Sequence, residues 1–144
     1  MFRIVHMEKI KLMICDDSHL ILQSIKNVLS DYYIDIFEAK NGAECVTYLD
    51  LYEGDYDLLT LDVHMPKMSG IDVLKKLNEM DIKLPNIMMI TTSNDAPTVL
   101  EACQLGASGY ITKPFTKEVL IEKIDQQLEK VGKKLVLKSE VVLD

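Results

Sequence analysis

Two kinds of hydrophobic pattern alternate along this chain. Short, continuous apolar runs occur at 10–15, 58–61 and 87–90, and weaker ones at 34–39 and 109–111. Runs that are apolar at nearly every position are typical of parallel strands covered on both faces. Between them, apolar residues recur every three or four positions, as they do along one face of a helix. The sequence therefore predicts five units, each a strand followed by a helix.

The helical segments carry their own start signals. We expect helices over 41–52, 70–80 and 96–105, and two more that show clear apolar stripes. Ser18, Asn41 and Thr116 are residue types that cap helices, and Pro97 suits a first turn. Strands alternating with helices predict a doubly wound α/β domain with a parallel sheet. The two stripes consist of Ile21, Ile25, Val28, Leu29 and Tyr32, and of Leu120, Ile124, Leu128 and Val131.

Length and composition indicate one globular domain. The chain has 144 residues, of which 48% are hydrophobic and 27% charged, and such a chain buries a sizeable core. We assign the domain to residues 9–131, an N-terminal extension to 1–8 and a C-terminal tail to 132–144. Three readings of the tail stay open, namely a short strand, a frayed end and the start of a linker.

Charge and cysteine usage narrow the class of protein. The net charge of −7 argues against nucleic-acid binding, because no basic patch is available to neutralise phosphates. No apolar run approaches the ~20 residues that a membrane helix needs. Three scattered cysteines without a CxxC pair are typical of reduced, mostly buried thiols, so we expect a cytoplasmic protein.

Chemically active side chains follow several of the predicted strands. Asp16 and Asp17 come after the first strand, Asp62 after the third, Thr91 at the end of the fourth and Lys113 after the fifth. In an open α/β sheet the carboxyl ends of the strands form the ligand site. If the first and third strands are neighbours, three carboxylates converge there and need a cation, either Mg²⁺ or the lysine. A carboxylate, a cation and two donors are the groups that phosphoryl transfer uses.

With these motifs the chain resembles the response-regulator receiver domains of two-component signalling, the CheY-like family. The resemblance covers about residues 9–131 and implies a flavodoxin-like, three-layer α/β/α fold. It also implies a five-stranded parallel sheet of order 2-1-3-4-5. The motifs are Asp16-Asp17-Ser18, Leu61-Asp62-Val63-His64-Met65-Pro66-Lys67-Met68-Ser69-Gly70, Ile90-Thr91-Thr92 and Gly106-Ala107-Ser108-Gly109-Tyr110-Ile111-Thr112-Lys113-Pro114-Phe115.

The resemblance implies a role for each residue of the acidic site. Asp62 accepts the phosphoryl group from a phosphohistidine of a partner. Asp17 and Asp62 bind Mg²⁺ directly with the backbone carbonyl of His64, while Asp16 acts mainly through water. Lys113 pairs with a phosphoryl oxygen, and its bond to the following proline is cis in this family.

A switch and a set of tuning residues follow from the same resemblance. Thr91 moves towards the phosphoryl group and Tyr110 swings inward, which alters the face made by the helix at 96–105, the strand at 109–111 and the last helix. His64, Thr92 and Ser93 occupy positions that tune phosphoryl lifetime in the family. Thr92 stands where the family commonly has alanine, so we expect the larger side chain to narrow the access of the kinase or of water to the phosphoryl group. His64 and Ser93 are neither acids nor amides, so we expect a longer-lived phosphoaspartate.

We therefore expect a single-domain response regulator, a phospho-accepting switch that is not a turnover enzyme. Its expected partners are a sensor histidine kinase or a histidine phosphotransfer protein, and a downstream protein target; phosphorylation-dependent dimerisation stays open. One alternative is the isolated receiver of a larger regulator such as a transcription factor. A haloacid-dehalogenase-like phosphatase would instead carry D-x-D after its first strand. A flavodoxin-like carrier would need a Ser/Thr/Gly-rich loop there.

Overall fold

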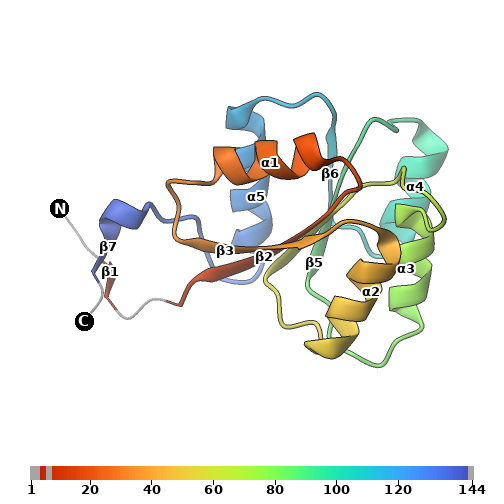
Figure 1. Cartoon of the computed structure of the whole chain (residues 1–144), viewed down its shortest axis with the longest axis horizontal. Coiled ribbons are helices and arrows are strands. Elements are labelled where there is room, and N and C mark those ends of the chain that lie inside the picture. Colours follow the sequence, from red (N-terminus) through yellow and green to blue (C-terminus); the bar gives the residue numbers. More distant parts are fainter. Residues whose placement is uncertain (1–3, 6–7, 143–144) are drawn as a thin grey trace.

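A computed structural model of the chain describes residues 4–5 and 8–142. Its strands and helices alternate as the hydrophobic pattern predicts (Figure 1). The strands are β1 (Ile4–Val5), β2 (Ile10–Cys15), β3 (Ile34–Ala39), β4 (Leu58–Leu61), β5 (Asn86–Thr91), β6 (Gly109–Thr112) and β7 (Val141–Val142). The helices are α1 (His19–Val28), α2 (Gly42–Leu51), α3 (Gly70–Asn78), α4 (Ala96–Gln104), α5 (Lys117–Glu129) and the 3₁₀ helix η1 (Lys138–Glu140).

The main sheet has five parallel strands in the order β3-β2-β4-β5-β6. Counted along the chain, these five strands have the order 2-1-3-4-5, which confirms the expected fold. The order places β2 beside β4, with Cys15 opposite Leu61 at the last paired position. Consequently the residues that follow these two strands meet at one edge of the sheet.

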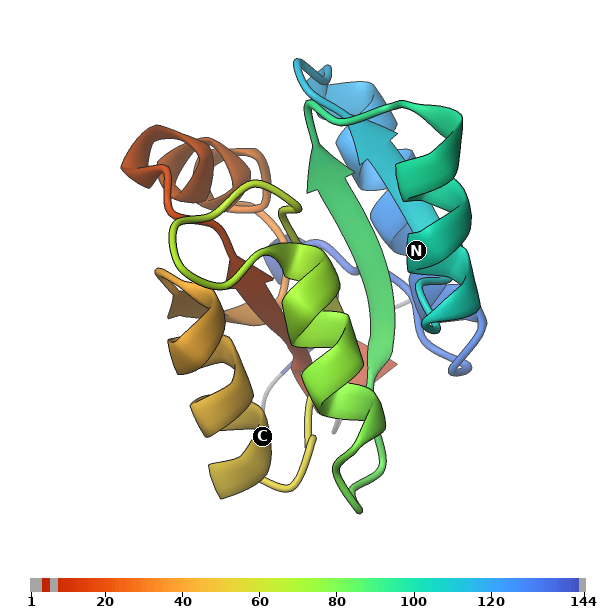
Figure 2. The same cartoon turned by 90° about the vertical axis from the view of Figure 1, so that its right-hand side faces the viewer.

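Helices cover both faces of the sheet, which explains why its central strands lack polar alternation. All four residues of β4 are buried. In Figure 2, α2, α3 and α4 lie in front of the strands, and α1 and α5 lie behind them. Two hydrophobic clusters correspond to these two faces, one formed with α2 and α3 and the other with α1 and α5. None of the described helices is long and apolar enough to cross a membrane.

The ends of the helices confirm the predicted start signals and show that both apolar stripes run past their helices. Ser18, Asn41 and Thr116 each accept a backbone N–H at the start of a helix. The stripe assigned to the first helix runs too far, because α1 ends at Val28 and Tyr32 lies beyond the following turn, in an isolated bridge with Leu137. The last stripe is also too long. α5 ends at Glu129, and Val131 is 42% exposed instead of joining the core.

The C-terminal tail packs against the domain and then forms a second, small sheet. Val136 is 2% exposed, and its carbonyl accepts the Tyr33 N–H at 2.7 Å. Further along, the Lys138 N–H donates to the Asp31 carbonyl at 2.8 Å. β7 then pairs in parallel with β1, beyond the amino-terminal edge of the main sheet (Figure 1). Of the three readings of the tail, the structure favours the short strand.

Candidate functional site

The carboxylates of Asp16 and Asp62 are brought together by backbone hydrogen bonds that continue beyond the strands. The Asp62 N–H donates to the Cys15 carbonyl at 3.0 Å, and the Asp16 N–H donates to the Ala39 carbonyl at 3.1 Å. Each aspartate is therefore held at the carboxyl edge by its neighbouring strand. Asp16 is 2% exposed and Asp62 is 5% exposed. Two buried carboxylates side by side need a partner of opposite charge.

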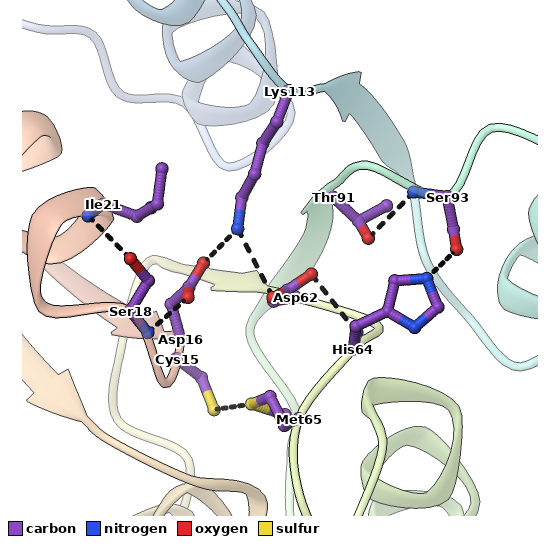
Figure 3. A network of polar contacts seen from close by, with 10 residues as sticks. All are labelled: Cys15, Asp16, Ser18, Ile21, Asp62, His64, Met65, Thr91, Ser93 and Lys113. Atoms are coloured by element: carbon purple, nitrogen blue, oxygen red, sulfur yellow. Dashed lines mark hydrogen bonds and ion pairs between the residues drawn. The ribbon is translucent and has the colours of Figure 1, made fainter.

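Lys113 supplies that charge within the protein. Its N–H donates to the Thr91 carbonyl at 2.8 Å, which fixes the start of its loop beside β5. The ammonium lies 2.6 Å from Asp16 Oδ2 and 3.3 Å from Asp62 Oδ2 (Figure 3). The bond to Pro114 is cis, as the resemblance implies. One ammonium thus bridges both buried carboxylates.

A third carboxylate makes the site a candidate metal centre. Asp17 is exposed, yet one oxygen from each of Asp16, Asp17 and Asp62 lies within 4.8 Å of the others. Carboxylate oxygens so grouped fit a hard cation that keeps some of its waters, as Mg²⁺ does. The set carries three potential negative charges against one lysine, so a divalent cation would balance it.

Electrostatics of the site also favour a cation. Burial raises the pKa of the Asp16 carboxyl above its ordinary value, although the hydrogen bond and charge of Lys113 oppose the rise. Because this pKa is higher in the folded chain, the folded state binds the proton more tightly than the unfolded state does. Its contribution to stability therefore falls as the pH rises from the ordinary carboxyl pKa through the raised one. Ionising Asp16 therefore costs folding free energy, and a bound cation would reduce this cost.

The loop after β4 is held close to the site by Gly70. Its N–H donates to the Val63 carbonyl at 2.8 Å. A Cβ on this residue would lie 2.1 Å from the Asp62 carbonyl oxygen, so only glycine fits here. Ser69 forms a capping box with Asp72 at the start of α3. The Ser-x-x-Asp spacing is a signal for that cap that can be read in the sequence.

The expected switch residues lie beside the carboxylates but do not bond to them. Thr91 is fully buried at the end of β5, and its hydroxyl accepts the Ser93 N–H at 3.2 Å. Among the described residues it makes no hydrogen bond to Asp62. Tyr110 is half-buried and donates its hydroxyl to the Ser93 carbonyl. Burial, followed by the charges of Asp95 and Asp62, raises the pKa of Tyr110, so the hydroxyl remains a donor at neutral pH.

The three positions expected to tune phosphoryl lifetime divide into a pair and a single residue. The His64 backbone N–H donates to Asp62 Oδ1 at 3.3 Å, and its ring nitrogen Nε2 hydrogen-bonds to the Ser93 hydroxyl (Figure 3). Thr92 is exposed and takes part in no side-chain hydrogen bond among the described residues. The family resemblance grouped all three as positions that tune phosphoryl lifetime. The contact between His64 and Ser93 has no sequence signal, because 29 positions separate them.

Comparison with known proteins agrees with this fold and site. The profile of the response regulator receiver domain family matches residues 12–125. The chain is 36% identical over 124 residues to the chemotaxis protein CheY of Pseudomonas aeruginosa, covering 85% of this chain and 98% of that one. It is 40% identical over 117 residues to CheY1 of Helicobacter pylori, covering 80% and 94%. The chain belongs to the response regulator receiver domain family and is CheY-like.

A solved structure supports the same assignment. The CheY of Borrelia burgdorferi, in a complex described as CheX-CheY-BeF3-Mg²⁺, is 27% identical to this chain. It aligns with a TM-score of 0.75 over 87% of this chain and 90% of that one. The family match ends at residue 125, so the docked tail lies outside it.

Proposed function

We propose that this protein is a response regulator in which Asp62 accepts a phosphoryl group in a Mg²⁺-dependent reaction. The observation that carries the proposal is the grouping of Asp62 with Asp16, Asp17 and Lys113 at the carboxyl edge of the sheet. A nucleophilic carboxylate beside two further carboxylates and one ammonium is suited to receiving a phosphoryl group.

Each side chain has a defined task in this reaction. A carboxylate oxygen of Asp62 attacks the phosphorus of the donor, and the bond from phosphorus to the leaving group breaks, so that the leaving group departs with the electron pair. Lys113, 3.3 Å from Asp62 Oδ2, offsets negative charge on the phosphoryl oxygens. The His64 N–H, 3.3 Å from Asp62 Oδ1, supplies a further donor. The buried hydroxyl of Thr91, at the end of β5, would donate to a phosphoryl oxygen.

The carboxylates of Asp16, Asp17 and Asp62 would hold Mg²⁺. The ion, when bound, neutralises charge on the phosphoryl oxygens and the acids together. Carboxylates grouped within 4.8 Å support this assignment, as does the Mg²⁺ named in the Borrelia burgdorferi complex. The backbone carbonyl of His64 is a further ligand implied by the family.

The partners follow from the family. A sensor histidine kinase or histidine phosphotransfer protein would supply the phosphoryl group, and the face made by α4, β6 and α5 would bind a downstream protein target. We further propose that the protein works in the cytoplasm as a single-domain switch, not as a turnover enzyme. Both CheY relatives consist almost entirely of the matched region, 98% and 94% of their lengths, which supports the single-domain part of this proposal.

Acetyl phosphate labelling tests the proposal. The protein is incubated with acetyl phosphate and Mg²⁺, and its intact mass is followed over time. We expect the mass of one phosphoryl group to be added to the wild type, and none to Asp62→Asn or to wild type in excess EDTA. Asp31→Asn, which changes an exposed aspartate far from the cluster, is the matched control and should label as the wild type does.

Two outcomes would contradict the proposal. Unlabelled wild type, or equal labelling of Asp62→Asn, would exclude Asp62 as the acceptor. Turnover of many equivalents of a phosphate monoester would instead favour the phosphatase alternative.

A further inference from the structure

Ser93 joins three separate parts of the protein through its three polar groups. It lies just after β5, in the loop that leads to α4. Its N–H donates to the Thr91 hydroxyl at 3.2 Å, its own hydroxyl bonds to the His64 ring, and its carbonyl accepts the Tyr110 hydroxyl. Figure 3 shows the first two of these contacts. One short residue therefore links the end of β5, Tyr110 of β6 and the loop after β4.

On the other side, His64 connects this residue to the acidic site. Its backbone N–H donates to Asp62 Oδ1 at 3.3 Å while its ring reaches Ser93 (Figure 3). A continuous chain of hydrogen bonds thus runs from Asp62 through His64 and Ser93 to Tyr110. Within this chain of hydrogen bonds, the contact between the His64 and Ser93 side chains connects the loop after β4 to the loop after β5.

This contact would be made in only one of two positions of the loop after β5. The Thr91 hydroxyl has no hydrogen bond to Asp62 among the described residues. The family resemblance implies that Thr91 moves towards a phosphoryl group on Asp62, and the end of β5 would move with it. Ser93 is tied to Thr91 by its N–H and moves with it. The His64 ring stays with the loop after β4. A relative shift of the two loops would separate the imidazole from the hydroxyl.

We infer that the hydrogen bond between His64 and Ser93 is a latch that holds the loop after β5 in its resting position, with Ser93 acting as a positioning residue. The inference rests on the proposed function of Asp62. A contact made in only one of two arrangements lowers the population of the other. Loss of the latch should therefore strengthen binding of any group on Asp62 that needs the loop to move.

Beryllium fluoride with Mg²⁺, a phosphoryl analogue, provides an equilibrium probe of this latch. Its dissociation constant is measured by calorimetry for wild type, Ser93→Ala, His64→Ala and the double variant. Each single variant should bind about two- to tenfold more tightly, the range expected for one net hydrogen bond of ~0.5–1.5 kcal/mol. The double variant should bind no more tightly than either single one, because both substitutions remove the same contact.

Two further variants control the experiment. Ser93→Thr keeps the hydroxyl and should retain wild-type affinity. Ser139→Ala removes a hydroxyl from the exposed η1 and should change nothing. Thermal unfolding of each variant establishes that it is folded, as expected for substitutions of an exposed and a half-buried side chain.

Unchanged or weaker binding in the single variants would overturn the latch. Additive effects in the double variant would also overturn it, since they would show that His64 and Ser93 act independently. Failure of the wild type to bind the analogue, or to be labelled by acetyl phosphate, would be a failure of the proposed function. Wild type that binds and is labelled, with no gain in Ser93→Ala, would remove the latch alone.

Discussion

Replacing Asp17 by asparagine should make the protein more stable in the absence of Mg²⁺. The carboxylate of Asp17 is exposed and, among the described residues, takes part in no hydrogen bond or ion pair, so the substitution breaks no described contact. It removes repulsion from Asp16 and Asp62, whose oxygens lie within 4.8 Å. An exposed charge that repels two neighbours lowers the stability of the folded chain, and the proposed binding of Mg²⁺ would explain why it is retained.

The size of the effect follows from the same distance. Two unit charges 4.8 Å apart repel by about 0.9 kcal/mol even at the dielectric constant of bulk water, and burial of the two partners raises this value. Two such repulsions, offset in part by the attraction of Lys113, which bridges the same two carboxylates, leave a gain of about 1 kcal/mol at low ionic strength. For a chain of this size that is roughly 3 °C in melting temperature. Salt should reduce the gain, because Asp17 is exposed to screening ions.

Urea unfolding in EDTA, and again in excess Mg²⁺, measures this difference. In EDTA we expect Asp17→Asn to be more stable than wild type. In Mg²⁺ the difference in unfolding free energy should become smaller or change sign, since the wild type gains binding free energy that the variant lacks. Asp31→Asn, an exposed aspartate outside the cluster, serves as the control and should match the wild type in both buffers. A variant equal to or less stable than wild type in EDTA would refute the electrostatic reasoning.

Two further substitutions test the packing around the site and the tail. Val136→Ala should lower the free energy of unfolding by about 2 kcal/mol, because it removes two buried methyl groups at ~0.8 kcal/mol each and leaves a cavity; Val131→Ala, at a 42% exposed position, should have little effect in the same urea titration, and equal effects would mean that the tail is not docked in solution. Gly70→Ala places a Cβ 2.1 Å from the Asp62 carbonyl oxygen and should cost about 3 kcal/mol in urea unfolding while weakening Mg²⁺ binding in a titration; wild-type values for both would contradict the close approach.

Local patterns were sufficient for the main elements of the fold. Apolar runs at 10–15, 34–39 and 58–61 coincide with β2, β3 and β4, because a strand covered on both faces has no room for polar residues. Caps at Ser18 and Asn41 were equally readable, since a short polar side chain at a helix start bonds to the next turn whatever its surroundings. The helix ends were less accurate because no glycine or proline marks where α1 stops at Val28.

Tertiary structure decided what the tail does. Leu135, Val136 and Leu137 are apolar, but three residues are too few to distinguish a short strand from a frayed end or the start of a linker. Val136 is buried only because the tail packs against the domain, where the Val136 carbonyl accepts the Tyr33 N–H. Such docking depends on surfaces from distant parts of the chain, which a local pattern does not contain.

The site divides in the same way. The sequence by itself determined which carboxylates, hydroxyl and lysine stand at the ends of the strands, because each follows an apolar run in the chain. Three-dimensional folding decided their pairing, in which Lys113 bridges Asp16 and Asp62, and it placed the His64 ring against Ser93. Distances between side chains arise from the order and twist of the strands, and residues far apart in the chain carry no local record of them.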